Sequence, residues 1–224
     1  MTLSAILLAG GRSRRMGVDK ATVLIAGKPL WERQLRILSE LWPEALWVSA
    51  RAVPPWCPPE IEAVFDRPPS RGPLSGLAAG LRRLKTSHLA VLAIDLPQMT
   101  SEHLNKLWGL VRPGVGVVPL HGDYFEPLCA VYPAEALAAA EAALKGSDAS
   151  LQHFAQTLLR QSRIRVYDLT PEEWPLYLNV NTPADLPAKV GASNPVKVGV
   201  ADSQKTGAYP IPPSWFSGSV NGRL

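Results

Sequence analysis

Residues 4–11 have the sequence Ser-Ala-Ile-Leu-Leu-Ala-Gly-Gly, and this stretch decides the fold class. Its first six residues form a short, mostly apolar run, which is typical of a strand buried on both faces of a parallel sheet. Two glycines end the run, and glycine lets a backbone turn tightly or approach a ligand without a Cβ clash. The stretch therefore predicts a central strand followed by a glycine turn.

Strand-like runs and helical patterns alternate along the rest of the chain. Helical patterns occupy residues 30–41, 73–84, 101–110 (with Ser101 as the N-cap), 133–144 and 150–159. Strand-like runs occupy residues 45–50, 61–65, 88–94, 115–119, 128–132 and 163–169, with a shorter apolar stretch at 22–26. This alternation predicts an α/β fold with a predominantly parallel, mixed sheet, helices on both faces and ligands beyond the carboxyl ends of the strands.

The chain of 224 residues can bury a full core, and its hydrophobic periodicity stops near residue 187. We therefore expect one domain over residues 1–186 and a poorly ordered, Pro/Gly/Ser-rich tail over residues 187–224. The sequence has neither a long apolar run nor a signal-peptide pattern, so we expect no membrane partner and a cytoplasmic location. Cys57 and Cys129 are predicted to be free thiols, because their spacing fits neither a disulfide framework nor a zinc site.

The net charge of +4 is concentrated in two short segments. Residues 12–20 carry four cations against one carboxylate, residues 187–224 do the same, and the remainder is slightly acidic. A nucleic-acid-binding domain would carry a basic face with interleaved aromatic residues on its body. We therefore expect no nucleic-acid partner.

The segment that follows the first strand gathers glycines and cations, namely Gly10, Gly11, Arg12, Arg14, Arg15, Gly17 and Lys20. Exposed backbone N–H groups, guanidinium forks and a lysine together suit the oxygens of a triphosphate. The spacing fits neither the dinucleotide fingerprint nor the P-loop, which disfavours both classes. A glycine turn with solvated charges is the alternative, but four cations after a buried strand favour phosphate binding.

Asp95 directly follows the apolar run 88–94, with Pro97 two residues later. A carboxylate at a strand end projects into the ligand crevice, where Mg²⁺ prefers one or two carboxylates together with phosphate oxygens and water. Asp95 is therefore the predicted metal ligand. An ordinary turn or cap residue is the alternative.

Residues 8–20, Leu-Ala-Gly-Gly-Arg-Ser-Arg-Arg-Met-Gly-Val-Asp-Lys, are similar to the signature of the nucleotidyltransferases that include molybdenum cofactor guanylyltransferase. Residues 94–99 resemble the same family's metal-binding Asp-x-Pro segment, and the resemblance extends over residues 3–186. It implies a three-layer α/β/α, Rossmann-like fold of the nucleotide-diphospho-sugar transferase (GT-A-like) type. It also implies Arg15, Lys20 and Asp95 as catalytic residues and, for nucleotide binding, Leu8, Ala9, Gly10, Gly11, Arg12, Gly17, Lys20, Asp66 and Asp95.

Asp66 and residues 72–76, Gly-Pro-Leu-Ser-Gly, resemble the family's elements of the nucleotide pocket. A carboxylate at position 66 could accept hydrogen bonds from a guanine edge or a ribose hydroxyl, and a weak surface pair with Arg67 is the alternative. Members of the family often carry asparagine after the second strand, whereas this chain has Arg51. We therefore assign no base contact to residues 49–51.

Two later segments resemble the acceptor side of the family. Glu126-Pro127 takes the place of a polar residue and proline that precede a strand, and residues 179–183, Asn-Val-Asn-Thr-Pro, are similar to the closing motif. The resemblance implies that Asn179 and Asn181 bind a pterin acceptor. By itself the closing segment is equally consistent with a helix N-cap.

The resemblance implies transfer of GMP from GTP to the molybdenum–molybdopterin cofactor, with Mg²⁺ as cofactor and with molybdopterin guanine dinucleotide and pyrophosphate as products. Implied protein partners are molybdopterin-carrying proteins and molybdoenzymes. Two alternatives remain: a cytidylyl- or sugar-phosphate nucleotidyltransferase, and a catalytically silent cofactor-binding adaptor. The four histidines lack the pattern of a hydrolase and are expected at the surface or in packing, and tryptophans such as Trp42 and Trp47 are expected in the core.

Overall fold

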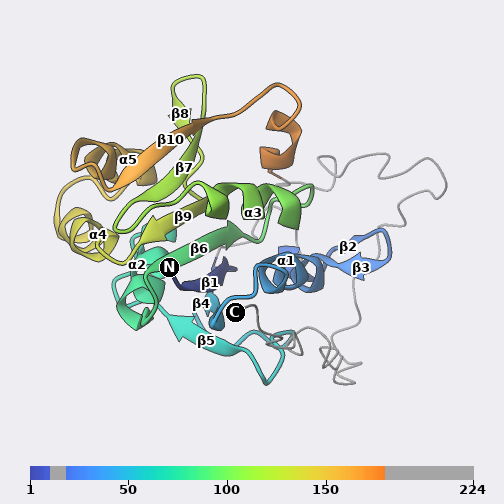
Figure 1. Cartoon of the computed structure of the whole chain (residues 1–224). Coiled ribbons are helices and arrows are strands. Elements are labelled where there is room, and N and C mark those ends of the chain that lie inside the picture. The colour runs from blue at the N-terminus through green and yellow to red at the C-terminus, as the bar shows by residue number, and fades with distance from the viewer. Residues whose placement is uncertain (11–18, 180–224) are drawn as a thin grey trace, which may run out of the picture.

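The computed structural model describes residues 1–10 and 19–179, which form an α/β fold around one central sheet (Figure 1). The strands follow the order β10-β7-β9-β6-β1-β4-β5, and the short β8 pairs with β7 beside this path. Their bounds are β1 (Leu3–Leu8), β4 (Ala45–Ala50), β5 (Glu62–Phe65), β6 (His88–Ala93), β7 (Gly116–His121), β8 (Tyr124–Phe125), β9 (Cys129–Pro133) and β10 (Ile164–Asp168). The domain end at residue 186 and the tail lie outside the described residues.

Most neighbouring strands run in parallel. β1 is parallel to β4 and β6, β4 to β5, and β7 to β10, whereas β9 is antiparallel to both β6 and β7. The predicted mixed, predominantly parallel sheet is therefore confirmed. The carboxyl ends of β5, β4, β1, β6, β7 and β10 meet at one edge of the sheet, where the N-terminus of β9 also lies.

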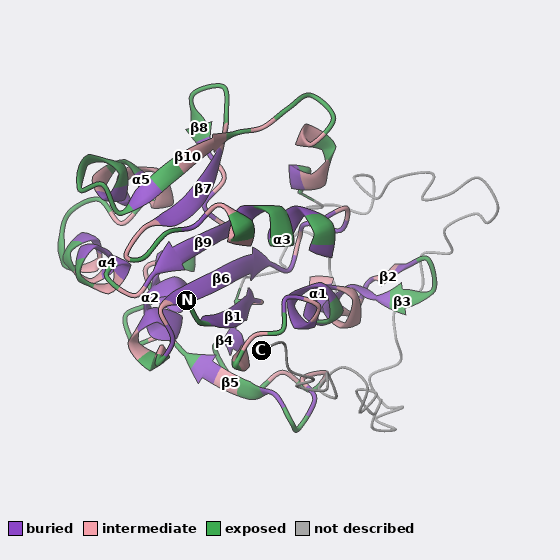
Figure 2. Ribbon diagram, viewed as in Figure 1, coloured by how far each residue is buried: buried purple, intermediate pink, exposed green. Residues whose placement is uncertain are grey.

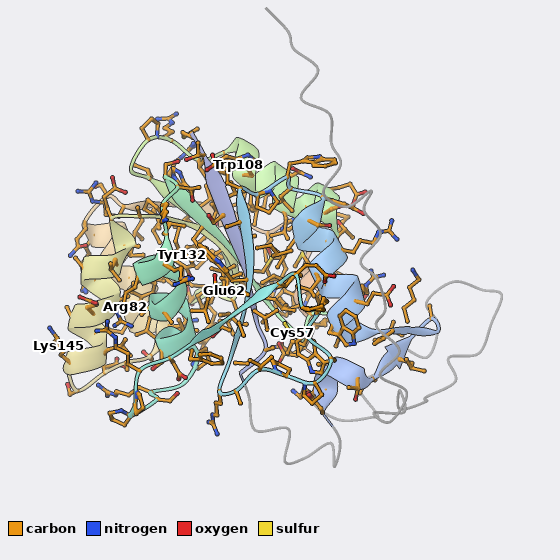
Figure 3. The ribbon with its side chains drawn as sticks, turned by 90° about the horizontal axis from the view of Figure 1, so that it is seen from below. Cys57, Glu62, Arg82, Trp108, Tyr132 and Lys145 are labelled. Carbon is orange, nitrogen blue, oxygen red and sulfur yellow. The ribbon has the colours of Figure 1, made fainter. Side chains whose placement is uncertain are left out.

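Helices cover both faces of the sheet, which makes the fold three-layered (Figure 3). α1 (Leu30–Ser39) and α3 (Ser101–Gly109) lie on one face, and α2 (Pro73–Arg83), α4 (Ala136–Lys145) and α5 (Leu151–Arg160) lie on the other. Successive residues of β1 alternate between the two faces: Ala5 and Leu7 pack with α1 and α3, and Ile6 and Leu8 with α2. This alternation explains the continuous apolar run, since both faces of β1 are buried (Figure 2).

The first residue of α2 agrees with the sequence prediction, whereas the starts of α3 and α4 differ from it. α2 begins at Pro73, which follows Gly72 at a φ of +80°, as expected for proline in the first helical position. α3 is capped by Thr100, whose hydroxyl accepts from the His103 backbone N–H at 3.2 Å, so the predicted cap Ser101 is wrong by one residue. α4 begins at Ala136 rather than at residue 133, because Pro133 is still the last residue of β9.

Several short elements differ from the sequence-based expectation. The apolar stretch 22–26 is divided between the 3-10 helix η1 (Lys20–Thr22) and the two-stranded ribbon of β2 (Leu24–Ile25) and β3 (Lys28–Pro29). β8 and the 3-10 helix η2 (Trp174–Tyr177) were missed, because they are too short to show a period. The helix predicted near residues 185–186 lies outside the described residues.

Two tryptophans test the expectation that this residue type marks the core. Trp47 is buried as expected, but Trp42 is 63% exposed and the expectation is wrong for it. Trp42 has a φ of +52° just after α1, where the chain turns toward β4, so its side chain points away from the packed layers. Within residues 1–10 and 19–179, no helix is both long and apolar enough to cross a membrane.

Candidate active site

A pocket of about 230 Å³ opens at the carboxyl edge of the sheet, beyond the ends of β1, β4, β5 and β6. Six of the residues predicted to bind nucleotide line it together: Leu8, Ala9, Gly10, Lys20, Asp66 and Asp95. The wall also contains residues that were not predicted, namely Ser49, Ala50, Arg51, Ser70, Ala93, Ile94 and Leu128. Most of them lie at or just after a predicted strand end, as Asp95 does, but Leu128 begins a predicted strand and Ser70 lies five residues beyond one.

Lys20 and Asp95 form the charged centre of this pocket. The Lys20 ammonium nitrogen lies 3.6 Å from the Asp95 Oδ2 atom, and the two side chains are 17% and 24% exposed. A lysine and a carboxylate that share one partly exposed site can together receive an anion and a divalent cation. This geometry brings together two of the three residues predicted to be catalytic; the third, Arg15, lies outside the described residues.

The segment carrying Asp95 is held by α1. The Gln34 side-chain nitrogen donates to the Leu96 carbonyl at 2.6 Å, and Arg33 Nε donates to the Pro97 carbonyl at 2.8 Å. The Ile94 backbone N–H donates to a carbonyl of the neighbouring β1 at 3.1 Å. The carboxylate therefore stands on a backbone fixed from two sides, which limits the reorganisation needed when a ligand binds.

Asp19 lines the same pocket and fixes the short element that carries Lys20. One of its carboxylate oxygens accepts from the Ala21 N–H at 3.0 Å and so caps η1, and the other accepts from the Trp56 indole N–H at 2.9 Å. Trp56 in turn stacks on Trp31 of α1, with ring centroids 5.8 Å apart. These contacts fix the start of η1, at which Lys20 is the first residue.

The N-terminus of α2 forms another wall of the pocket through Gly72, Pro73 and Gly76. The helix lies very close to β4, since a Cβ atom on Gly76 would be 2.5 Å from the Ser49 hydroxyl. Backbone N–H groups at a helix N-terminus favour negatively charged ligands. Asp66 lies nearby at the end of β5, and among the described residues no ion pair joins it to Arg67, the alternative weighed for it.

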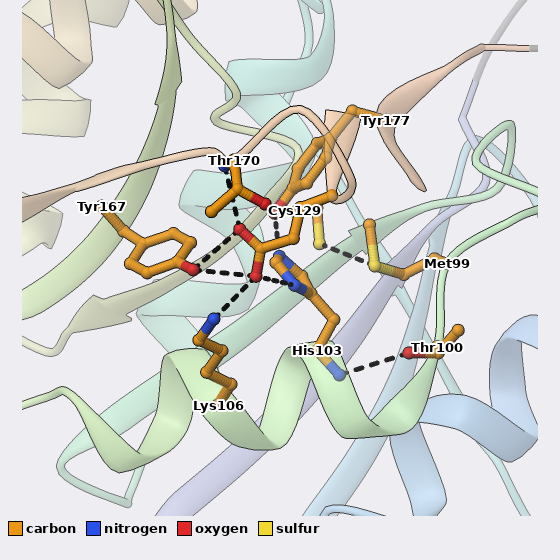
Figure 4. Close-up of polar contacts among 9 residues, drawn as sticks. Met99, Thr100, His103, Lys106, Cys129, Tyr167, Thr170 and Tyr177 are labelled. Atoms are coloured by element: carbon orange, nitrogen blue, oxygen red, sulfur yellow. Dashed lines mark hydrogen bonds and ion pairs between the residues drawn. The ribbon is translucent and has the colours of Figure 1, made fainter. Parts of the chain in front are cut away.

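A polar cluster lies farther along the same edge, beside α3 and η2 (Figure 4). The Glu173 carboxylate accepts from Lys106 at 2.8 Å, from the Tyr167 hydroxyl at 2.7 Å and from the Thr170 backbone N–H at 3.1 Å. Burial alone would raise the pKa of Glu173, but these hydrogen bonds outweigh it and hold the pKa at about 2. Glu173 is therefore ionised at neutral pH.

His103 connects this cluster to η2. Its Nε2 atom lies 2.7 Å from the Tyr177 hydroxyl, and its Nδ1 atom lies 3.5 Å from Glu173. Both rings are buried, and burial lowers the pKa of His103. Because Tyr177 precedes the exposed Asn179 by two residues, the cluster fixes the chain just before the predicted acceptor motif.

The remaining candidates lie elsewhere. Asn179 is described but is not in the pocket wall, and Gly11, Arg12, Arg15, Gly17 and Asn181 lie outside the described residues.

His88 has a packing role as expected, since its buried ring bonds the Arg112 carbonyl at 3.1 Å. Cys57 and Cys129 are free thiols, as predicted. Across the described ranges no group of three or more His, Cys, Asp or Glu residues could hold a metal ion by itself.

Residues 5–164 match the sequence model of the MobA-like NTP transferase domain. The chain belongs to this family. The match spans the strands β1, β4 and β6 that bear the pocket, so the predicted resemblance and the nucleotidyltransferase class are both confirmed.

Curated relatives of this MobA-like chain have consistent names. A probable molybdenum cofactor guanylyltransferase from Opitutus terrae is 39% identical over 186 residues, which cover 82% of this chain and 92% of the relative. A molybdenum cofactor guanylyltransferase from Syntrophotalea carbinolica is 29% identical over 192 residues, covering 81% and 88%. Both alignments extend over most of each protein, so the relatedness is not confined to a single motif.

Solved structures support the fold. The molybdopterin-guanine dinucleotide biosynthesis protein A from Archaeoglobus fulgidus superposes with a TM-score of 0.61 at 26% identity, covering 82% of this chain and 94% of that one. A nucleotidyl transferase from a Methanothermobacter species gives 0.65 at 15% identity, covering 82% and 94%. The predicted Rossmann-like nucleotidyltransferase fold is thus confirmed.

Proposed function

We propose that this MobA-like chain transfers GMP from GTP to the molybdenum–molybdopterin cofactor, giving molybdopterin guanine dinucleotide and pyrophosphate. The observation that carries the proposal is the 3.6 Å contact between Lys20 and Asp95, in a pocket that also contains Gly10 and Asp66. The choice of GTP and a pterin acceptor is supported by the names of the relatives, among them the one 39% identical from Opitutus terrae.

The chemistry requires no nucleophile from the protein. A phosphate oxygen of the acceptor attacks the α-phosphorus of GTP, the bond from that phosphorus to the bridging oxygen breaks, and pyrophosphate leaves with the electron pair. In this proposal Lys20 neutralises charge that develops on the departing phosphates, which its contact with Asp95 in the pocket supports. Gly10 and the N-terminus of α2 offer backbone approach and N–H donors, so positioning and charge neutralisation supply the rate enhancement.

The residues present fit one Mg²⁺ ion. Mg²⁺ is commonly bound by one or two carboxylates together with substrate phosphates and water, and Asp95 is a partly exposed carboxylate beside the predicted phosphate site. The described residues offer no all-protein cage, which agrees with that mode of binding. When bound, the ion would supply charge neutralisation at the phosphates. Asp95 would hold it.

The order of strand ends divides the site into two halves. β1, β4 and β5 lie on one side of β6 and carry Gly10, Arg51 and Asp66, while β9 and β7 lie on its other side. We assign GTP to the first half and the acceptor to the second. Asp95, at the end of β6, then stands between the donor and the acceptor, as in-line transfer requires.

The proposal is tested by measuring pyrophosphate release with GTP, CTP or ATP and Mg²⁺, each in the presence and absence of molybdopterin. We expect release that depends on molybdopterin and is fastest with GTP. Fastest release with CTP, or release that depends instead on a sugar phosphate, would replace the proposal with a related nucleotidyl transfer. Binding of nucleotide and pterin without any release would indicate an adaptor.

A further inference from the structure

The loop that carries Glu126 has a backbone fixed on both sides. The Glu126 N–H donates to the Pro119 carbonyl of β7 at 2.8 Å, and the Leu128 carbonyl accepts from the Ala93 N–H of β6 at 2.8 Å. The buried Tyr132 hydroxyl donates to the carbonyl of the intervening proline, also at 2.8 Å. The loop is therefore a rigid platform between the ends of β6 and β7.

The Glu126 side chain on this platform has no polar partner among the residues that the structure describes. The Glu126 carboxylate is half-buried, yet it has no hydrogen bond or ion pair to any residue in the described part of the chain. Partly buried carboxylates normally accept hydrogen bonds, since desolvation otherwise disfavours the charged form. Here burial raises the pKa of Glu126 to about 7, which is the signature of a carboxylate that lacks donors.

The groups that face Glu126 cannot supply a positive charge. Cys129 of β9 and Tyr177 of η2 are close enough that Glu126 contributes to raising the pKa of each, and burial raises both further. Both are therefore neutral near pH 7. A rigid, desolvated carboxylate with no partner among residues 1–10 and 19–179, two residues before the pocket residue Leu128, is a candidate for ligand recognition.

The position of Glu126 indicates which ligand it faces. It lies three residues before the start of β9, which lies between β6 and β7, so it stands on the side of Asp95 away from β1, β4 and β5. Adjacent strands are about 4.8 Å apart, which puts Glu126 within the span of a small molecule whose phosphate lies at Asp95. This is the acceptor half of the site.

We propose that Glu126 is a specificity-determining residue that reads the acceptor's 2-amino-4-oxopteridine ring, by accepting the 2-amino and adjacent ring N–H donors on its two carboxylate oxygens. The inference rests on the proposed function, since it takes the acceptor to be a pterin. Two parallel donors match a carboxylate as a guanidinium fork does. A ring that lacks the amino group presents a carbonyl oxygen to the same carboxylate and is rejected.

The test combines a change of ligand with a change of residue. Binding of a pterin phosphate, and of its 2,4-dioxopteridine counterpart in which oxygen replaces the 2-amino group, is followed by pteridine fluorescence at pH 8. The wild-type chain is expected to prefer the pterin by about 10- to 100-fold, as hydrogen bonds to a charged group would give. In the Glu126→Gln variant the dissociation constants of the two pteridines should differ by no more than about threefold. The reason is that the glutamine amide has an N–H donor where the carboxylate has a second acceptor oxygen. The exposed Asp123→Asn on the adjacent hairpin is the matched control and should keep the preference.

Equal binding of the two pteridines by the wild-type chain, or an unchanged preference in Glu126→Gln, would overturn the assignment of Glu126. Steady-state kinetics provide a second readout: Glu126→Gln should raise the KM for the acceptor about 10- to 100-fold and leave the KM for GTP unchanged. Equal increases in the KM for the acceptor and the KM for GTP would indicate a structural role for Glu126, and would also overturn the assignment. Failure of the proposed function is distinguishable from failure of the Glu126 assignment, because the two are measured separately. The proposed function fails if the wild-type chain shows no molybdopterin-dependent pyrophosphate release, whereas the comparison of pteridine binding tests the Glu126 assignment without turnover.

Discussion

The Lys20 ammonium lies 3.6 Å from the Asp95 carboxylate, although the two residues come from distant parts of the sequence. The sheet accounts for this contact. β1 and β6 are parallel neighbours in register from Leu3 and His88 to Leu8 and Ala93, so the turns after them leave the same edge side by side. Asp19 then fixes η1 and α1 fixes the Asp95 turn, which sets the approach of the two charges.

Asp95→Asn is expected to reduce pyrophosphate release at least about 100-fold, the usual cost of removing a group that stabilises transition-state charge. The side chain is 24% exposed and lies outside the apolar core, so the melting temperature should change little. Turnover and thermal unfolding are measured on the same preparation. Asp123→Asn, an exposed carboxylate at the other end of the edge, should retain full activity. Undiminished release in the Asp95 variant would rule out its assigned role.

Tyr177→Phe should lower the melting temperature by about 2–4 °C, because it removes a buried hydrogen bond worth about 1 kcal/mol and leaves the His103 nitrogen without its partner. The matched control is Tyr124→Phe, which removes the hydroxyl of a tyrosine that is 71% exposed and should leave the transition unchanged. Hydrogen exchange of the Leu176 and Leu178 amides, which donate to the Glu173 and Pro175 carbonyls, should also accelerate in the Tyr177 variant. Protection equal to that of the wild type would show that the cluster does not fix this segment.

Glu173 should contribute stability that depends on pH. Its pKa is held at about 2 in the folded protein, below its ordinary value of about 4.5, so the unfolded chain takes up the proton first as the pH falls. The contribution is complete above about pH 4.5 and is lost progressively down to about pH 2. Urea unfolding of Glu173→Gln should therefore show a large deficit relative to wild type at pH 7 and a small one near pH 2.5. A deficit that stays constant across this range would contradict the prediction.

Sequence patterns located the half of the site that we propose for GTP, because its residues follow strands with strong signals. Leu8 and Asp95 end long apolar runs, and the parallel arrangement that such runs imply brings strand ends together. The half that we propose for the acceptor was harder to predict, because it depends on long-range contacts. No local pattern indicates that Glu126 is desolvated, or that Tyr177 of a one-turn helix reaches His103 of α3.

Substitution of Gly76 can test how closely α2 must approach β4. A Cβ atom there would lie 2.5 Å from the Ser49 hydroxyl oxygen, a distance that packed atoms do not tolerate, while the next nearest atoms would be 3.4 Å or more away. Gly76→Ala should therefore displace the helix or Ser49 and destabilise the fold by about 1–3 kcal/mol, the usual cost of overpacking. Because both residues line the pocket, weaker GTP binding should accompany the lower stability.

The second substitution Ser49→Ala removes the single atom responsible for the clash, so the double variant should recover most of the lost stability and GTP affinity. Gly109→Ala is the matched control, since a Cβ atom at the end of α3 would meet no atom within 4 Å. Alanine is also favoured over glycine within helices, so this control should not lose stability. Thermal unfolding and GTP titration of the wild type, Gly76→Ala, Ser49→Ala and the double variant measure the coupling between positions 49 and 76. Purely additive effects would show that the close approach of α2 to β4 does not shape the nucleotide pocket.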